Sequence, residues 1–336
     1  MKATINDIAE LTNVSKSTVS RVINNSGPVS EKTRRVVMAA MDQLDFKPNE
    51  IARSMSLRKT MTVGIVMQDI RNPYYANACW HGDRLFEQFG YSSVICNVDN
   101  DPEREQACLN SMGDRKVDGV LCIGPQEETS NIVRAVSELD IPVVLVDTDP
   151  SIPGIDTVTL DNVYGGQLVV DYLVSLGHRR IAFLTSDFTS AERDRRIGYE
   201  RGLSARGIEA DDSLIISQGE GQWHRGECPA LMDLIREGNA PTAIFASNDF
   251  KAIRIVRLLH RLGISIPDDI SLVGFDDTDS AAMVTPALST IHQPIDKMID
   301  IGVRILLRRM DGKEGEPEHA VLKPWLVERE STRKVQ

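Results

Sequence analysis

The stretch Thr4–Asn24 reads TINDIAELTNVSKSTVSRVIN, and it decides the fold of the N-terminal part of the chain. Its first apolar residues follow the i, i+3, i+4 spacing of one helix face: Ile5, Ile8 and Ala9. Thr4 followed by Asp7 is typical of a capping box at the start of a helix. We therefore expect a short amphipathic helix that ends near Leu11.

A second helix is expected directly after a tight turn at residues 12–14. Ser15 can cap it, because a serine hydroxyl accepts a hydrogen bond from the first free backbone N–H groups. Three apolar residues would face inward: Val19, Val22 and Ile23. Small polar and basic side chains occupy the opposite face: Lys16, Ser17, Ser20 and Arg21. This arrangement is typical of a helix-turn-helix whose second helix enters the DNA major groove.

The polar face of the second helix holds the candidate DNA contacts. Lys16 and Ser17 are candidates to reach base edges, since lysine donates to guanine O6 and N7 and serine pairs with several bases. Phosphate contacts are expected from four further residues: Thr18, Ser20, Arg21 and Asn24. The alternative for this set is an ordinary solvated helix face.

A third helix completes the N-terminal module. Ser30 opens it after Gly27-Pro28, and it runs to about Asp45. Its expected inward stripe is Val36, Val37, Ala40, Met41 and Leu44. Three short amphipathic helices can share one small core, so residues 1–47 are predicted to form an all-α DNA-binding domain.

The order and spacing of about fifty N-terminal residues closely resemble the LacI/GalR family of bacterial transcription regulators. The matching strings are Thr4–Ala9, Val14-Ser15, Thr18–Asn24, Val29-Ser30 and Ile51–Ser54. The resemblance implies a repressor that binds a pseudo-palindromic double-stranded operator as a homodimer. It also implies that a small molecule controls operator affinity from a separate sensing core. The polar and aromatic residues of that core, described below, suit a sugar or sugar acid.

Residues 48–61 are predicted to be a hinge helix and linker. The helical stretch Glu50–Ser56 is too short to be stable alone. The resemblance implies that two hinges fold together over the minor groove and insert an apolar residue at the central base step, a position aligned with Met55. Methionine is a known wedge of this kind, although ordinary linker packing is the alternative. Arg53 would add a salt-sensitive phosphate contact.

From Thr62 onward, apolar strand-like runs alternate with helical patterns. The runs are Val63–Met67, Ser93–Val98, Gly119–Ile123, Val143–Asp147, Ile181–Thr185, Ala243–Ala246 and Ser271–Phe275. This alternation predicts βαβ units in two doubly wound parallel sheets, with a ligand crevice at the carboxyl ends of the strands. The resemblance implies a periplasmic-binding-protein-like core whose chain crosses between lobes near Asp161, His292 and Val321. The lobes would be 62–161 with 293–321, and 162–292 with 322–336.

Polar and aromatic residues follow these strands, where a crevice would expose them. The candidate effector-binding residues are Tyr74, Asp147, Arg195, Trp223, Asn248 and Asp276. Carboxylate and amide groups bind hydroxyls, an arginine fork binds a hydroxyl pair or a carboxylate, and an indole ring covers an apolar sugar face. The family resemblance implies ligand contacts by Arg195 and Trp223. The alternatives are that Asn248 or Asp276 caps the next helix and that Trp223 lies in the core.

Charge and missing motifs narrow the function further. Residues 1–60 hold ten Lys and Arg against six Asp and Glu, whereas the remainder holds 28 against 43. This contrast indicates that the N-terminal segment meets a polyanion. The chain has no P-loop, dinucleotide-binding, nucleophile-elbow or zinc-protease motif, so we expect neither an enzyme nor a metal or cofactor. With no signal peptide or transmembrane segment, we expect a cytoplasmic protein. A cytosolic sugar-binding protein without DNA contacts is the alternative.

Overall fold

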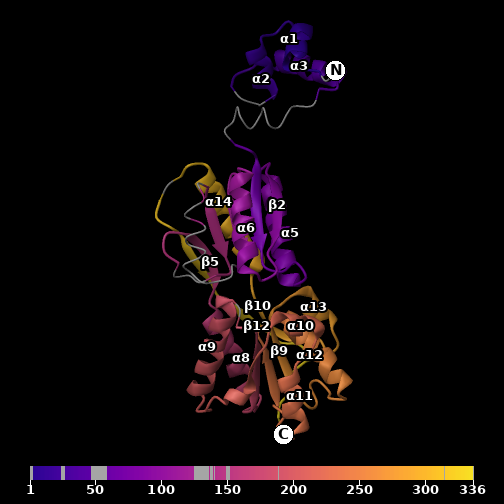
Figure 1. Ribbon diagram of the computed structural model, residues 1–336, viewed down its shortest axis with the longest axis vertical. Helices are drawn as coiled ribbons and strands as arrows, with labels where there is room; N and C mark the ends of the chain where they lie inside the picture. The colour runs from indigo at the N-terminus through magenta and orange to yellow at the C-terminus, as the bar shows by residue number, and fades with distance from the viewer. Residues whose placement is uncertain are drawn as a thin grey trace. The chain divides into compact units, whose positions relative to one another are not determined.

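The structure is a computed structural model in which the chain divides into two compact units, Met1–Met61 and Thr62–Gln336. Figure 1 shows the helical first unit and the two α/β lobes of the second. The structure describes residues 3–23, 27–46, 59–124, 136, 139, 141–148, 152–187, 189–313 and 315–335.

The first unit contains the three expected helices: α1 (Ile5–Thr12), α2 (Lys16–Ile23) and α3 (Glu31–Gln43). Their starts are capped as the sequence predicts. The Thr4 backbone N–H donates to Asp7 Oδ2 at 2.7 Å, and this bond lowers the pKa of the Asp7 carboxyl. Ser15 Oγ accepts from the backbone N–H of Thr18, and Ser30 Oγ accepts from that of Thr33, both at 3.2 Å.

A small apolar core joins the three helices. Its buried members are Ile8, Val19, Val22, Val37 and Ala40. Met41 and Leu44 pack against this core, but Val36 is 44% exposed, so its predicted inward position was wrong. Val36 and Val37 are adjacent, and on a helix adjacent residues cannot share one narrow face.

The second unit holds two lobes, each built on one sheet. The N-terminal lobe comprises β1 (Thr62–Met67), α5 (Pro73–Gln88), β2 (Ser92–Asn97), α6 (Pro102–Asp114), β3 (Val120–Ile123), β4 (Val143–Val146), β5 (Asp156–Leu160), α14 (Ile295–Met310) and β11 (His319–Leu322). The C-terminal lobe comprises α8 (Asn162–Ser175), β6 (Ile181–Thr185), α9 (Ser190–Ala205), the 3₁₀ turn η1 (Asp212–Leu214), β7 (Ile215–Ser217), α10 (Glu220–Arg225), α11 (Pro229–Arg236), β8 (Ala243–Ala246), α12 (Asp249–Arg261), β9 (Ser271–Asp276), α13 (Asp279–Met283), β10 (Ser289–His292) and β12 (Trp325–Val327).

Both sheets are doubly wound and confirm the predicted α/β core. The strand orders are β11-β5-β4-β3-β1-β2 and β12-β10-β9-β8-β6-β7. The described strand pairs are parallel except β10 with β12, which is antiparallel. Strands β3, β4, β6, β8 and β9 are buried along their whole length, as expected for sheets covered on both faces.

The chain passes between the lobes after β5, after β10 and after β11. Helix α14 therefore follows a C-terminal-lobe strand but packs against α5 and the strands of the N-terminal lobe (Figure 1). These crossings bring the carboxyl ends of the two sets of parallel strands toward a common crevice.

Two glycines set the close packing of α8 against α9. A Cβ on Gly166 would clash with the carbonyl oxygen of Arg195, and a Cβ on Gly198 would clash with that of Val163. Only glycine allows the backbones to approach so closely. This contact holds Arg195 beside the N-terminal turn of α8.

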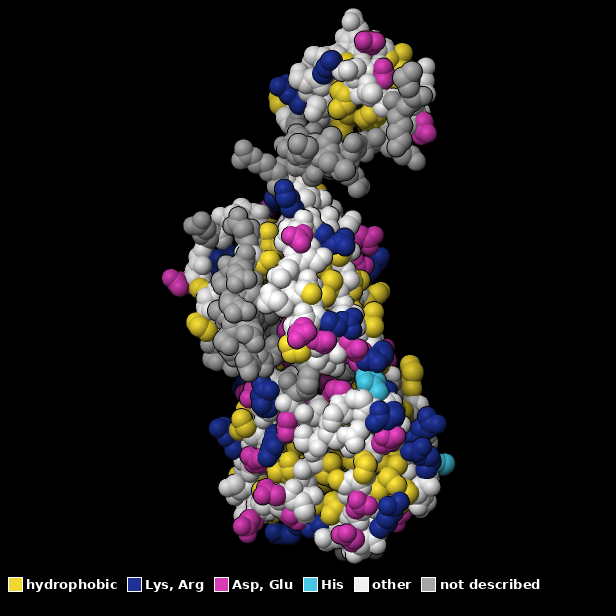
Figure 2. All heavy atoms as spheres, in the orientation of Figure 1, with side chains coloured by type: hydrophobic (Ala, Val, Ile, Leu, Met, Phe, Trp, Pro, Cys, Tyr) yellow, Lys and Arg dark blue, Asp and Glu magenta, His cyan; other side chains and the backbone are white. Residues whose placement is uncertain are grey.

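In the part of the chain that the structure describes, we find no helix with the length and apolar character needed to cross a membrane. On the face drawn in Figure 2, acidic and basic side chains of the second unit are interspersed.

Candidate functional site

The polar face of α2 carries the described DNA-contact candidates. The side chains of Lys16, Ser17 and Arg21 are exposed, and those of Thr18 and Ser20 are half-buried. Val19 and Val22 anchor the opposite face in the core, which fixes the direction of the polar face. The predicted contacts Asn24, Arg53 and Met55 lie outside the described residues.

Local hydrogen bonds order the first turn of α2. Ser15 Oγ lies 2.9 Å from Ser17 Oγ and 2.8 Å from Thr18 Oγ1. Lys16 and Arg21 add two positive charges to the same surface. A helix face of this composition fits the polyanionic backbone and the base edges of DNA.

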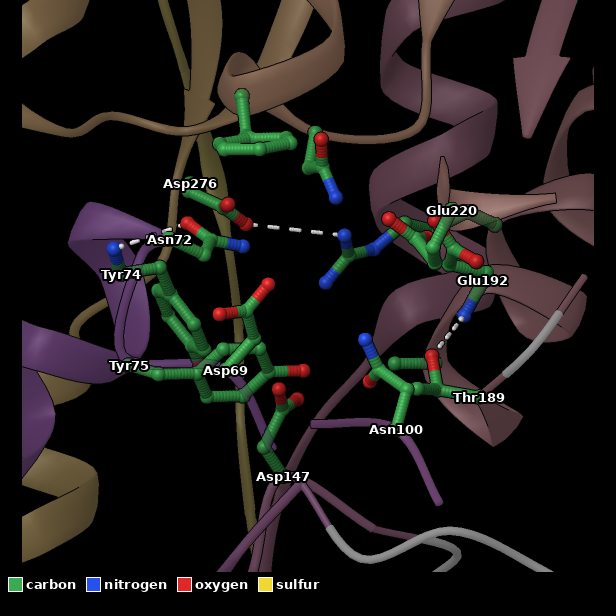
Figure 3. A pocket seen from close by; sticks show the side chains of 14 residues that line it. Asp69, Asn72, Tyr74, Tyr75, Asn100, Asp147, Thr189, Glu192, Glu220 and Asp276 are labelled. Carbon is green, nitrogen blue, oxygen red and sulfur yellow. Dashed lines mark hydrogen bonds and ion pairs between the residues drawn. The ribbon is translucent and has the colours of Figure 1, made fainter. Parts of the chain in front are cut away.

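The second site is a cavity between the two sheets of the core, and Figure 3 shows side chains of both lobes directed into it. The N-terminal lobe contributes Asp69, Asn72, Tyr74, Tyr75, Asn100 and Asp147. The C-terminal lobe contributes Thr189, Ala191, Glu192, Arg195, Glu220, Asn248, Phe250 and Asp276. Most of these residues end a strand or open the following helix, where the sequence predicts a crevice.

Five of the six predicted effector-binding residues line this one cavity: Tyr74, Asp147, Arg195, Asn248 and Asp276. Asn248 also caps α12, because its Oδ1 accepts from the backbone N–H of Lys251 at 2.9 Å. The capping alternative and the pocket position are therefore compatible for this residue.

Trp223 is the exception, and the structure places it in the core of the C-terminal lobe. Its side chain is 0% exposed and packs with apolar residues of β6, β8 and α12. Its indole N–H donates to the Thr185 carbonyl at 3.3 Å. A large ring on a short helix gains more from full burial than from a half-open cleft. The aromatic lining comes instead from Tyr74, Tyr75 and Phe250.

Arg195 is buried at the centre of the C-terminal half of the cavity and is only 3% exposed. Its Nε donates to Asn162 Oδ1 at 2.9 Å, and its Nη1 donates to the Ser247 carbonyl at 2.6 Å. The guanidinium stacks 3.8 Å from the centre of the Phe275 ring and lies 3.6 Å from Asp276 Oδ1. These contacts hold the guanidinium in one orientation.

Asp147 and Asp276 face the cavity from opposite lobes. Both are 5% exposed, and burial raises the pKa of each carboxyl above its ordinary value, although the charge of Arg195 opposes this shift. Asp276 Oδ1 accepts from the Gln293 side-chain amide at 2.7 Å. Both residues have a positive φ, 59° for Asp147 and 116° for Asp276. Strained backbone of this kind is concentrated at functional sites.

The tyrosines of α5 supply hydroxyl donors. Burial raises the pKa of Tyr74 and of Tyr75 well above the ordinary value, and the nearby carboxylates Asp147 and Asp276 add to this effect. Both phenols therefore stay protonated at neutral pH. Tyr74 donates to Gln293 Oε1 at 3.3 Å, which links α5 to the segment between the lobes.

Sequence reasoning missed the carboxylates Glu192 and Glu220. Lys251 is buried beside the cavity, and its Nζ lies 2.5 Å from Glu192 Oε1 and 3.1 Å from Glu220 Oε1. Despite burial, Lys251 lowers the pKa of Glu192 to about 2. One signal was available: Thr189 followed three residues later by Glu192 is a helix-start pattern, and Thr189 Oγ1 does accept from the Glu192 backbone N–H.

A further missed contact joins the lobes at the cavity. His224 Nε2 of α10 lies 2.9 Å from Asp69 Oδ2, which follows β1. Asp69 also accepts from Arg71 Nε at 2.8 Å, and these neighbours lower the pKa of its carboxyl against the effect of burial.

The helix-turn-helix unit and the two-lobed core together define a DNA-binding regulator with a small-molecule pocket. Comparison with known proteins identifies the family. A model of bacterial regulatory proteins of the lacI family matches residues 4–49, and a model of a periplasmic binding protein-like domain matches residues 170–332.

Full-length relatives agree with these matches. The HTH-type transcriptional regulator DegA of Bacillus subtilis (strain 168) is 35% identical over 99% of this chain and 98% of its own length. The ribose operon repressor of Escherichia coli (strain K12) is 31% identical over 98% of this chain and 99% of its own length. The chain belongs to the lacI family and is a DNA-binding transcriptional regulator controlled by a small effector.

A solved structure confirms the architecture. The lac repressor dimer bound to operator and the anti-inducer ONPF matches 99% of this chain and 100% of its own, with a TM-score of 0.84 and 27% identity. The relatives named here are transcriptional regulators rather than enzymes.

Proposed function

We propose that this protein is a transcriptional repressor that binds a pseudo-palindromic operator as a homodimer and changes its operator affinity when a sugar binds between the lobes. One observation carries the proposal: a helix-turn-helix unit with an exposed basic face shares a chain with a cavity lined from both lobes. The lac repressor relative is a dimer on operator, and the ribose operon repressor is named for a sugar. A regulator of this kind acts on DNA in the cytoplasm.

Residues 1–47 read the operator in this proposal. Lys16 and Ser17 reach base edges, and backbone phosphates are contacted by Thr18, Ser20, Arg21 and Asn24. Residues 48–61 form the hinge, in which Met55 wedges the central base step and Arg53 contacts phosphate. A homodimer places two recognition helices in successive major grooves, which matches a two-fold symmetric site.

The cavity supplies the control. Tyr74 and Asp147 belong to one lobe, whereas Arg195, Asn248 and Asp276 belong to the other. A ligand that bonds to residues of both lobes binds one arrangement of the lobes better than another. The difference between these two affinities sets how far the ligand shifts the population toward the better-bound arrangement. The domain limits that we propose for the lobes are 62–161 with 293–321, and 162–292 with 322–336.

The experiment is a titration of a palindromic operator with the full-length protein, with and without sugars that stabilise its core. Arg195→Ala is expected to abolish the response to sugar while leaving operator binding intact, because Arg195 lies in the cavity of the second unit. Arg206→Ala is the matched control, since Arg206 is the exposed C-cap residue of the same helix, α9, and pairs with Asp171. If no sugar that binds the core changes the midpoint of the operator titration, the proposed regulation of operator binding by sugar is excluded.

A further inference from the structure

One acidic side chain of the cavity carries an oxygen that has no hydrogen-bond partner in the described part of the chain. Asp147 is 5% exposed, and its Oδ1 accepts no hydrogen bond from any described residue. A buried acceptor left unsatisfied costs free energy, so a site of this kind is built to receive a donor. Asp147 directly follows β4 and has a positive φ. Figure 3 shows its carboxylate among the side chains that line the cavity.

The other carboxylates of the cavity already have cationic neighbours. Asp276 lies near Arg195, and Asp69 is bonded to Arg71. Glu192 and Glu220 share the Nζ of Lys251. These neighbours offset the charge of four acidic groups. The charge of Arg195 also acts on Asp147, but no described residue donates a hydrogen bond to Asp147 Oδ1.

Little positive charge is left for an anion. Among the described residues that line the cavity, Arg195 is the only one with a cationic side chain. Its Nε and Nη1 already donate to Asn162 and Ser247, and Asp276 lies beside it. A ligand carboxylate or phosphate would therefore enter a space lined by five acidic side chains and one arginine, two of whose N–H groups already donate within the protein.

We propose that the pocket selects polyhydroxy ligands that carry no negative charge, and that Asp147 determines this selectivity by accepting a hydroxyl or ammonium proton from the ligand. The inference rests on the proposed function, because it concerns the effector site of that function. It excludes sugar acids and sugar phosphates, which the family assignment alone leaves open.

The physical reason is the asymmetry between donors and anions at a buried carboxylate. A hydroxyl or ammonium group satisfies Oδ1 with a charge-assisted hydrogen bond. A carboxylate offers no proton at neutral pH, leaves Oδ1 unsatisfied and adds like-charge repulsion in a poorly solvated space. The cavity thus distinguishes neutral ligands from anionic ones in two ways: it offers hydrogen bonds to the neutral ligand and repels the anion.

The test is a calorimetric binding series on the full-length protein without DNA. The probes are pentoses and hexoses, each compared with the aldonate or uronate that has the same stereochemistry, and with the 2-amino derivative for the hexoses. We expect the tightest binder to be uncharged or amino-bearing, and its acid counterpart to bind at least about tenfold more weakly. An acid that binds as tightly as its neutral counterpart, or no binding by any compound, would overturn the inference.

Asp147→Asn is the informative variant, because asparagine has the same shape and also tolerates a positive φ. It should narrow the gap between the neutral sugar and its acid by about tenfold, since the repulsion is removed and an amide donor is gained. Asp233→Asn removes one charge from the exposed surface of α11 and should leave the gap unchanged. An unchanged gap in Asp147→Asn would assign the selectivity to other residues and contradict the proposal.

Operator binding measured on the same samples separates this inference from the proposed function. Neutral sugars that bind without changing operator affinity would support the charge selectivity and count against regulation of operator binding by sugar. Release of operator by a sugar acid would support that regulation and overturn the charge selectivity.

Discussion

Replacing Lys251 by methionine should strongly destabilise the C-terminal lobe. Lys251 is 1% exposed, and its Nζ contacts Glu192 and Glu220. The pKa of Glu192 falls from 4.5 to about 2, and a shift of that size corresponds to about 3 kcal/mol of stability at neutral pH. Removing one partner of a buried ion pair costs about 3–5 kcal/mol, which agrees with this value.

The assay is urea unfolding of the full-length protein followed by tryptophan fluorescence, because Trp223 is fully buried beside Lys251. The melting temperature should also fall by roughly 6–12 °C, at 2–4 °C per kcal/mol for a unit of this size. Lys297→Met replaces an exposed lysine and should change the free energy of unfolding by less than about 0.5 kcal/mol.

The pH dependence follows from the sign of the shift. Because the folded-state pKa of Glu192 is depressed, its stabilising contribution is present above pH 4.5 and is lost as the pH falls toward about 2. The difference between the wild type and Lys251→Met should therefore narrow over this range. A loss below about 1 kcal/mol at pH 7, or a difference that does not change with pH, would refute the reasoning.

Three further predictions concern other parts of the chain. His178 bonds to Thr242 and to the Arg333 carbonyl, and burial depresses its pKa. Its contribution to stability is therefore present above pH 6.5 and is lost as the pH falls below that value. His178→Gln should make the free energy of unfolding fall less steeply between pH 7.5 and pH 5.5. Gly166→Ala should cost about 1–3 kcal/mol and weaken sugar binding by displacing α9. Gly221→Ala in α10 should do neither, because its Cβ meets only the end of the Arg225 side chain. Met55→Ala should weaken operator binding more than binding to random duplex DNA, and equal losses in anisotropy titrations would argue against a wedge.

Much of the fold could be predicted because it depends on short-range patterns. The three N-terminal helices follow from apolar spacing and from capping residues such as Ser15 and Ser30, and the structure contains both caps. The buried parallel strands follow from continuous apolar runs such as Val143–Val146. Strand β5 was missed because its sequence, DTVTL, alternates polar and apolar residues although every side chain is buried.

The site was predictable where a residue's place in the chain sets its place in space. Asp147, Asn248 and Asp276 each stand at the carboxyl end of a buried parallel strand, and such ends meet at one edge of a sheet. Trp223 could not be placed, because a single aromatic residue on a helix as short as α10 does not show from the sequence whether its ring turns toward the cleft or the core. The pairing of Glu192 with Lys251 joins residues 59 positions apart, and only the folded chain brings them together.

The most direct test of the account is a competition between ligand and operator on one protein. Full-length protein is titrated with fluorescent palindromic operator, with and without a saturating sugar that raises its melting temperature, and the titration is repeated with Asp276→Asn. The account predicts that the sugar shifts the operator-binding midpoint at least tenfold in the wild type and not in the variant. A sugar that binds the core and leaves the wild-type midpoint unchanged would contradict the coupling between pocket and DNA.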